Sequence, residues 1–215
     1  MHDLGRNEDR LRGTYEFPFE FHHIDSTHPR YVMSYHWHVE CEIMRILQGT
    51  LTVTLDEKSF TAKAGDVIFV NSGVLHSGIP QDCIYQCIVF DMNMFLKFNS
   101  VCTEYMQKIS HQELLIYHHF TEKHPDIQRS VNSLFDSFWQ KKPGYELVVF
   151  GQFYHFFGLV FGNHYYLESL RKTRRDYKRI VQLKQVVEFI EKNYANPITP
   201  VSYTHLRAHE TRSNL

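Results

Sequence analysis

The sequence predicts an α+β fold in which an all-β N-terminal half precedes a helical region. Short apolar runs with period-2 alternation, separated by turn residues, recur between residues 14 and 90, as in a sandwich or a small barrel. Near residue 98 the apolar period becomes that of a helix. The 215 residues, 43% hydrophobic and 22% charged, have the composition of a folded globular protein with one large domain or two small ones.

Alternation and turns mark the strands of the first half. Leu51, Val53 and Leu55 alternate with threonines, so these apolar side chains share one face of a strand. Further strands are expected after short turns, at residues 58–63, 67–70 and 84–90.

Helical periodicity predicts three helices in the second half. The first carries one apolar stripe, formed by Ile127, Val131, Leu134, Phe135 and Phe138. The second, over residues 147–161, is apolar nearly all round, and we expect it to be covered on more than one side. The third runs from Ile180 to Ile190 and ends near Asn193, before Pro197.

Charge and composition exclude several classes of protein. Lys plus Arg number 23 and Asp plus Glu number 24, a net charge of −1 with neutral His, so the surface as a whole is not built for nucleic acid. The polar start contains no signal segment, and residues 147–162 fall short of the roughly 20 apolar residues of a bilayer span. The four cysteines form no CxxC pair. We therefore expect a cytoplasmic protein with reduced thiols and no membrane partner.

A group of histidines and carboxylates is the candidate functional site. Residues two apart on a strand share a face, so His36, His38 and Glu42 can point the same way, and His76 follows a later turn. Glu40 has the same parity, so either acid can complete the group, and Glu42 is preferred because the apolar run begins directly after it. Three imidazoles and a carboxylate are a donor set that suits several divalent metals.

The spacing of these residues resembles the two motifs of the cupin family. The first motif, HxHx(3)Ex(6)G, is matched by His36, His38, Glu42 and Gly49, and the second, Gx(5)PxGxxH, by Gly65, Gly73 and His76, with Asn71 where proline is usual. The resemblance covers about residues 14–98. It implies a cupin-type jelly-roll β-barrel in whose mouth the side chains of His36, His38, Glu42 and His76 converge.

The cupin resemblance also implies a ligand for these four side chains. In cupin enzymes the positions of His36, His38, Glu42 and His76 hold one divalent metal, such as Mn, Fe, Ni or Zn, and geometry decides among these metals. The alternative is a metal-free pocket in which the same residues hydrogen-bond a small ligand.

The C-terminal part resembles the AraC-type transcription regulators. The string FIEKNYANPIT, residues 189–199, is similar to the first helix and following turn of that family's DNA-binding domain. The resemblance implies an effector-binding barrel with an N-terminal arm (1–98), a helical dimerisation region (99–170), and a basic linker with the first helix of a truncated helix-turn-helix domain (171–200). It implies a homodimer through the helical region and a small polar metabolite, such as a sugar, as effector.

The end of the chain departs from that family. After Pro200 no apolar stripe follows, so the second helix and the recognition helix are absent, and DNA contact is expected only through that missing C-terminal domain. Residues 201–211 resemble translated library-adapter sequence, and we interpret residues 201–215 as a non-native tail. The basic run at 171–179 is expected to be a solvated linker, with phosphate contact as the alternative.

The function predicted from both resemblances is that of the ligand-sensing and dimerisation part of an AraC-type regulator, and not of an enzyme. The alternative is a metal-dependent cupin enzyme, a dioxygenase or a sugar isomerase, that uses the same four side chains. A third reading is a free-standing dimeric sensor that contacts another protein.

Overall fold

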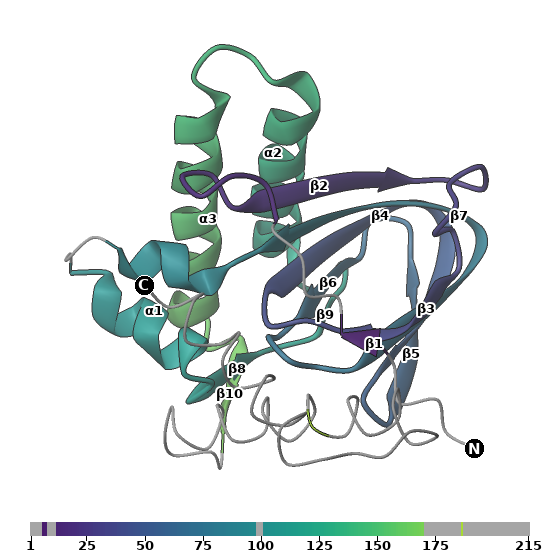
Figure 1. Ribbon diagram of the computed structural model, residues 1–215, viewed down its shortest axis with the longest axis horizontal. Helices are drawn as coiled ribbons and strands as arrows, with labels where there is room; N and C mark the ends of the chain where they lie inside the picture. The colour runs from purple at the N-terminus through teal and green to yellow at the C-terminus, as the bar shows by residue number, and fades with distance from the viewer. Residues whose placement is uncertain (1–5, 8–11, 98–100, 170–185, 187–215) are drawn as a thin grey trace, which may run out of the picture.

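The computed structural model describes residues 6–7, 12–97, 101–169 and 186 (Figure 1). The strands are β1 (Arg6–Asn7), β2 (Phe19–Ile24), β3 (Met33–Trp37), β4 (Cys41–Leu55), β5 (Lys58–Lys63), β6 (Val67–Val70), β7 (His76–Phe90), β8 (Leu114–Ile116), β9 (His119–Phe120) and β10 (Tyr166–Glu168). The helices are the 3₁₀ helix η1 (Met92–Leu96), α1 (Thr103–Ser110), α2 (Pro125–Gln140) and α3 (Tyr145–Gly162). The predicted α+β class, a mostly antiparallel sheet followed by helices, is confirmed.

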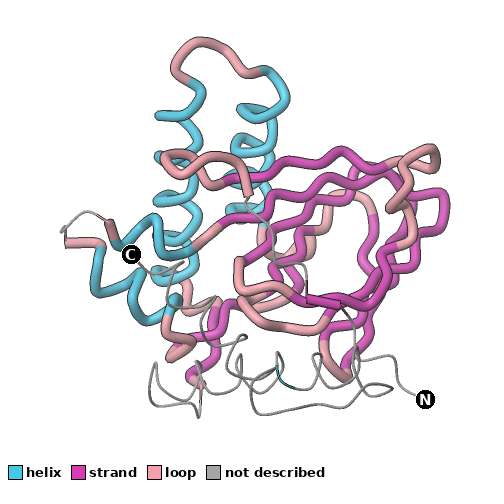
Figure 2. Tube along the Cα trace, in the orientation of Figure 1, coloured by secondary structure: helices cyan, strands magenta, loops and turns pink. Residues whose placement is uncertain are grey.

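Two long antiparallel strands, β4 and β7, organise an eight-stranded sheet that curls round on itself (Figure 2). The sheet consists of two half-sheets that share β4 and β7. In the half-sheet that contains the first half of β4 the strand order is β2-β7-β4-β6-β9, and in the half-sheet that contains its second half the order is β1-β3-β7-β4-β5. Between Ile46 and Thr50 the β4–β7 register shifts, and Gly49 lies in this shift with φ 67°. A Cβ at Gly49 would overlap the backbone of Asp82, so only glycine fits where the sheet bends.

The register shift changes which residues of β4 face the space between the two half-sheets. Met44 and Ile46 lie in the same buried cluster as Leu51, Val53 and Leu55, so the inward positions change from even to odd numbers across the shift. The predicted strand at 51–55 is confirmed, with its three apolar side chains buried and its threonines half-exposed. The extra residue of a bulge reverses which sequence positions, odd or even, face inward along the rest of the strand. The alternation of apolar and polar residues in the sequence does not by itself reveal this reversal.

The opposite face of the first half-sheet is covered by α2 and α3, which stand side by side against it (Figure 1). Ile43, Phe69 and Ile88 pack there against helix residues, so the start of β4 is buried on both faces. This explains its unbroken apolar run, which is typical of strands covered on both sides.

The helices agree with their predicted stripes to different extents. In α2 the predicted stripe, Ile127, Val131, Leu134, Phe135 and Phe138, is buried as expected. In α3 the buried face is formed by Val149, Phe153, Phe156, Phe157 and Val160. The expected cover on more than one side of α3 is confirmed, because Phe156 packs on Phe69 of β6, Phe153 on Phe95 of η1, and Phe161 on Tyr105 of α1. Only the first turn of α3 departs from this, with Leu147 80% exposed and Val148 47%. Among the described helices, none combines the length and apolarity needed to cross a membrane.

Several parts of the chain differ from the helical prediction or lie beyond the description. Three short strands occur among the helices: β9 pairs with β6, and β8 pairs with β10. Strands of two or three residues are too short to show a period in sequence. The predicted third helix, the basic linker and the 201–215 tail fall in residues 170–215. Of these residues the structure describes only position 186.

Thiol reactivity offers a first test of this packing. All four cysteines are thiols outside any disulfide, with Cys41, Cys83 and Cys87 buried and Cys102 partly exposed. Burial raises the pKa of the Cys41 thiol to about 12 and that of Cys83 to about 11. Because the thiolate is the reactive form, we expect Ellman's reagent at mildly alkaline pH to modify Cys102 first and the others only on unfolding.

The matched control for thiol titration is Cys102→Ser, which should remove the fast phase and leave the slow one. Rapid modification of more than one thiol per native chain would show that the β4–β7 interface is more open than the structure indicates.

Candidate metal and effector site

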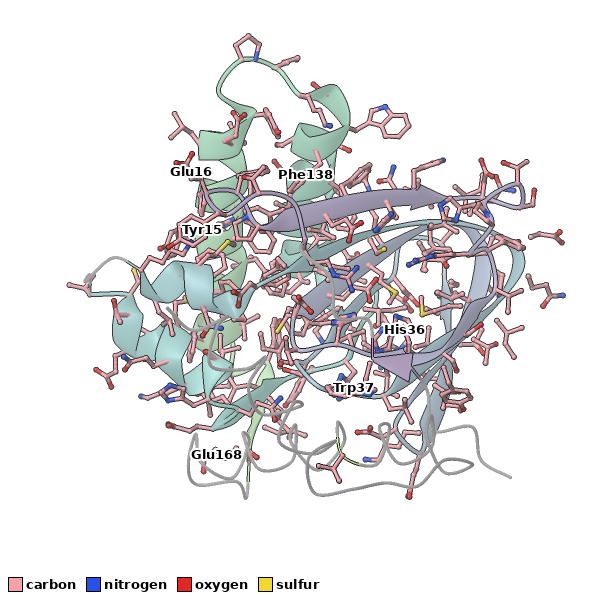
Figure 3. All side chains as sticks on the ribbon, in the orientation of Figure 1. Tyr15, Glu16, His36, Trp37, Phe138 and Glu168 are labelled. Atoms are coloured by element: carbon pink, nitrogen blue, oxygen red, sulfur yellow. The ribbon has the colours of Figure 1, made fainter. Side chains whose placement is uncertain are left out.

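The structure brings together all four predicted site residues at one end of the curled sheet. His36 on β3 is paired with His76, the first residue of β7, while Glu42 lies on the other half-sheet opposite Val89. One ligand atom from each of His36, His38, Glu42 and His76 lies within 4.8 Å of the others. Figure 3 shows His36 inside the ring of strands. The cluster therefore bridges the two half-sheets.

The backbone between the two motif histidines and the acid is not the single strand that parity reasoning assumed. β3 ends at Trp37 and β4 begins at Cys41, so His38 lies in the segment that crosses between them. That crossing carries the chain from the β3 half-sheet to the β6 half-sheet. Glu42 then points inward as an even-numbered residue of β4, like Met44.

Each of the three histidines is oriented by a backbone carbonyl. The Nδ1 atoms of His36, His38 and His76 lie 2.9, 3.1 and 2.8 Å from the carbonyl oxygens of Ser34, Glu40 and Val74. A carbonyl only accepts, so in each ring Nδ1–H is the donor, and in the neutral form of the ring Nε2 carries the lone pair. This is the arrangement that fixes metal-binding imidazoles.

The Nε2 atoms of His38 and His76 converge on Glu42. They lie 3.6 and 3.2 Å from Glu42 Oε2, and both nitrogens are buried without a hydrogen-bond partner. Two ligands at about 2.1 Å from one ion are separated by roughly 3.0 to 3.4 Å, so the His76–Glu42 distance is that of two ligands of one cation and the His38–Glu42 distance is slightly longer. Burial raises the pKa of Glu42, but the positive charge that His38 and His76 carry when protonated outweighs it and holds that pKa well below its usual value.

The structure also separates the two candidate acids. Glu40 Oε2 lies 3.7 Å from His38 Nδ1, on the side of the ring away from Nε2. Burial raises the pKa of Glu40. Glu42, and not Glu40, belongs to the group of four, as the onset of the apolar run indicated.

A second polar group, formed by Arg12, Glu20 and His22, lies at this end of the sheet. Arg12 is 3% exposed, and its Nη1 donates to Glu20 Oε2 at 2.7 Å, while His22 Nε2 lies 3.3 Å from Glu20 Oε1. Glu20 and Glu42 both lie opposite Val89, from either side of β7, so they occupy the same face of the sheet. Only the β2–β7 register, a long-range pairing, reveals this placement.

An antiparallel barrel-like sheet with a buried histidine and carboxylate cluster, covered by helices on one outer face, defines a ligand-binding β-domain. The model of the family described as AraC-like ligand binding domain matches residues 18–157, more than half of the chain. The chain belongs to this family of ligand-binding domains of transcription regulators.

Similarity to individual proteins is weaker. The uncharacterized HTH-type transcriptional regulator YdeC of Bacillus subtilis (strain 168) is 24% identical over 172 residues, which cover 76% of this chain and 57% of that protein. Among solved structures, oxalate decarboxylase of Bacillus subtilis is 25% identical over 28% of this chain and 18% of that chain, with a TM-score of 0.26. An overlap this short supports no conclusion about fold or function. The chain spans little more than half the length of YdeC.

Proposed function

We propose that the chain is the ligand-sensing and dimerisation part of an AraC-type transcription regulator, and that its effector binds beside one divalent metal held by His36, His38, Glu42 and His76. The observation that supports a metal is that the Nε2 atoms of His38 and His76, both buried and without a hydrogen-bond partner, face the Glu42 carboxylate. A buried carboxylate and two buried lone pairs are costly without a partner. A divalent cation such as Mn, Fe, Ni or Zn satisfies all three.

The chain's own residues prepare this site. The carbonyls behind each Nδ1 hold the three imidazoles in the tautomer that offers Nε2, and Glu42 supplies one negative charge. The bound metal would present a Lewis-acidic position for an oxygen atom of the effector. The Arg12, Glu20 and His22 group lies on the same face of the sheet and offers hydrogen-bonding partners to a small polar metabolite such as a sugar.

The remaining parts of the proposal follow from the family. In this reading the β-domain is a jelly-roll barrel of the cupin type, the chain pairs with a second copy through the α2–α3 region, and the regulator contacts DNA in the cytoplasm through its C-terminal domain. The exposed Leu147 and Val148 give α3 apolar surface for such pairing. An effector shifts this equilibrium only if it binds one arrangement better than another.

Calorimetric titration with Mn²⁺, Ni²⁺ and Zn²⁺ tests the proposal. We expect one site per chain in the native protein and none in the variant H38A/H76A, because two of the four donors are then lost. His28→Ala is the matched control, since His28 is only half-buried and lies outside the cluster. Equal binding by the native protein and H38A/H76A would refute the site, and sedimentation of the same samples as monomers would refute the dimer.

The metal-dependent cupin enzyme remains the second candidate because the same cluster of three imidazoles and one carboxylate also suits catalysis. Turnover of an oxygen-dependent or isomerisation substrate that disappears in H38A/H76A would favour the enzyme. Ligand-dependent stabilisation without any turnover would favour the sensor.

A further inference from the structure

The turn formed by residues 71–74, here named the 71–74 turn, lies directly behind the histidine cluster. The Gly73 N–H donates to the His38 carbonyl at 2.9 Å, and the Val74 carbonyl accepts from His76 Nδ1 at 2.8 Å. Ser72 Oγ also donates to the carbonyl of Val39. Gly73 has φ 73°, a conformation that favours glycine. One turn thus contacts two of the four site histidines.

The other side of the 71–74 turn is bonded to β8 through the side chain of Asn71. Asn71 Nδ2 donates to the Ile116 carbonyl at 2.8 Å, and the Ile116 N–H donates to Asn71 Oδ1 at 3.0 Å. Gln112 Nε2 donates to the Ser72 carbonyl. Asn71, Ile116 and Gln112 are all buried. The Asn71 amide therefore pairs with Ile116 as a neighbouring strand would.

The residue type at position 71 is informative. In the resembling cupin motif this position is usually proline, which has no side-chain amide and cannot make either bond to Ile116. Asparagine here buries a polar group, and both its amide nitrogen and its carbonyl oxygen are satisfied by one residue of β8. Breaking either of the two Asn71–Ile116 hydrogen bonds would leave a buried polar group unpaired, which is costly. We therefore expect the 71–74 turn and β8 to move together.

Strand β8 in turn pairs with β10, the last described strand before the C-terminal segment. Ile116 is paired with Tyr166, the Tyr117 N–H donates to the Tyr165 carbonyl at 3.1 Å, and the Ser169 N–H donates to the Glu113 carbonyl at 2.8 Å. Continuous hydrogen bonding therefore leads from His38 and His76 through Asn71 to the β8–β10 ribbon.

We infer that Asn71 is a positioning residue that couples occupancy of the four-residue cluster to the β8–β10 ribbon. The inference rests on the proposed metal site and deepens it by naming the side chain through which the site acts. A metal that fixes His38 and His76 also fixes the carbonyl and N–H groups of the 71–74 turn bonded to them. The two bonds of the Asn71 amide pass this restraint to Ile116, and so to the strand that leads into the C-terminal segment.

Hydrogen exchange of the full chain with and without Zn²⁺ tests this coupling. In the native protein we expect Zn²⁺ to slow exchange of the amides at 114–117 and 165–169 by about tenfold. In Asn71→Ala we expect Zn²⁺ affinity within about threefold of the native value but no Zn²⁺ effect on the ribbon. Asn71→Asp keeps the acceptor for the Ile116 N–H and should retain part of the effect.

Asn132→Ala is the matched control, because Asn132 lies on α2, away from the turn, and its amide oxygen accepts from Arg45 of β4; this variant should show the native response. If Asn71→Ala does not fold, the comparison of Asn71→Asp with the native protein decides, and an undiminished response in Asn71→Asp overturns the inference. Zn²⁺ binding with equal ribbon protection in native and Asn71→Ala proteins also overturns the role of Asn71. Absence of Zn²⁺ binding in the native protein refutes instead the proposed site on which the inference rests.

Discussion

Replacing His76 with alanine is expected to remove most of the metal-dependent stabilisation of the fold. A ligand that binds only the native state adds about 2.7 kcal/mol to the free energy of unfolding at one hundred times its Kd. His76 is fully buried, and its Nε2 lies 3.2 Å from Glu42 Oε2. Its loss removes one of four donors from the cluster. Urea unfolding with and without metal measures the difference between the two proteins.

The control for this experiment is His28→Ala, at a half-buried histidine outside the cluster, which should keep the full increase in unfolding free energy that metal gives the native protein. The metal-free form of His76→Ala is also expected to be less stable than the native protein, because an empty space replaces a buried ring. The quantity that distinguishes the two variants is therefore the increase in the free energy of unfolding on adding metal. If metal raised the free energy of unfolding of His76→Ala as much as that of the native protein, the ion would bind elsewhere.

The donor set could be predicted from sequence because it depends on local spacing. His36, His38, Glu42 and His76 are identified by intervals of a few residues and by a family pattern, and the structure brings them together. The choice of Glu42 depends on the crossing between β3 and β4, which directs Glu40 to the far side of the His38 ring. Strand alternation gave no preference between Glu40 and Glu42, since both are even-numbered positions that would face the same side of a continuous strand.

The surroundings of the site could not be predicted because they depend on long-range pairing. Glu20 reaches the same face as Glu42 only through the β2–β7 and β4–β7 registers, which join residues far apart in the chain. Asn71 was visible only as a departure from the family pattern, and its bonds to Ile116 connect residues 45 positions apart. The stripe of α2 was predictable because helical periodicity is local and the helix is long.

Phe153→Ala is expected to cause the largest loss of stability, about 3 to 5 kcal/mol. Phe153 lies on α3, is fully buried, and its ring centroid is 5.0 Å from Phe19, 4.6 Å from Phe90 and 5.7 Å from Phe95. Through these rings one side chain joins α3 to β2, β7 and η1. Aromatic pairs contribute about 0.5 to 1.5 kcal/mol each beyond the area they bury, so truncation removes contacts to three elements at once.

Urea unfolding compares Phe153→Ala with Leu147→Ala on the same helix. Leu147 is 80% exposed, so its truncation should change the free energy of unfolding by no more than about 0.5 kcal/mol. The loss in Phe153→Ala should be equal with and without metal, unlike that in His76→Ala, because Phe153 packs between the sheet and the helices and does not belong to the four-residue group. A loss below about 1 kcal/mol would show that α3 is held to the sheet by other contacts. A loss that depends on metal would instead show that the helix layer and the cluster are thermodynamically linked.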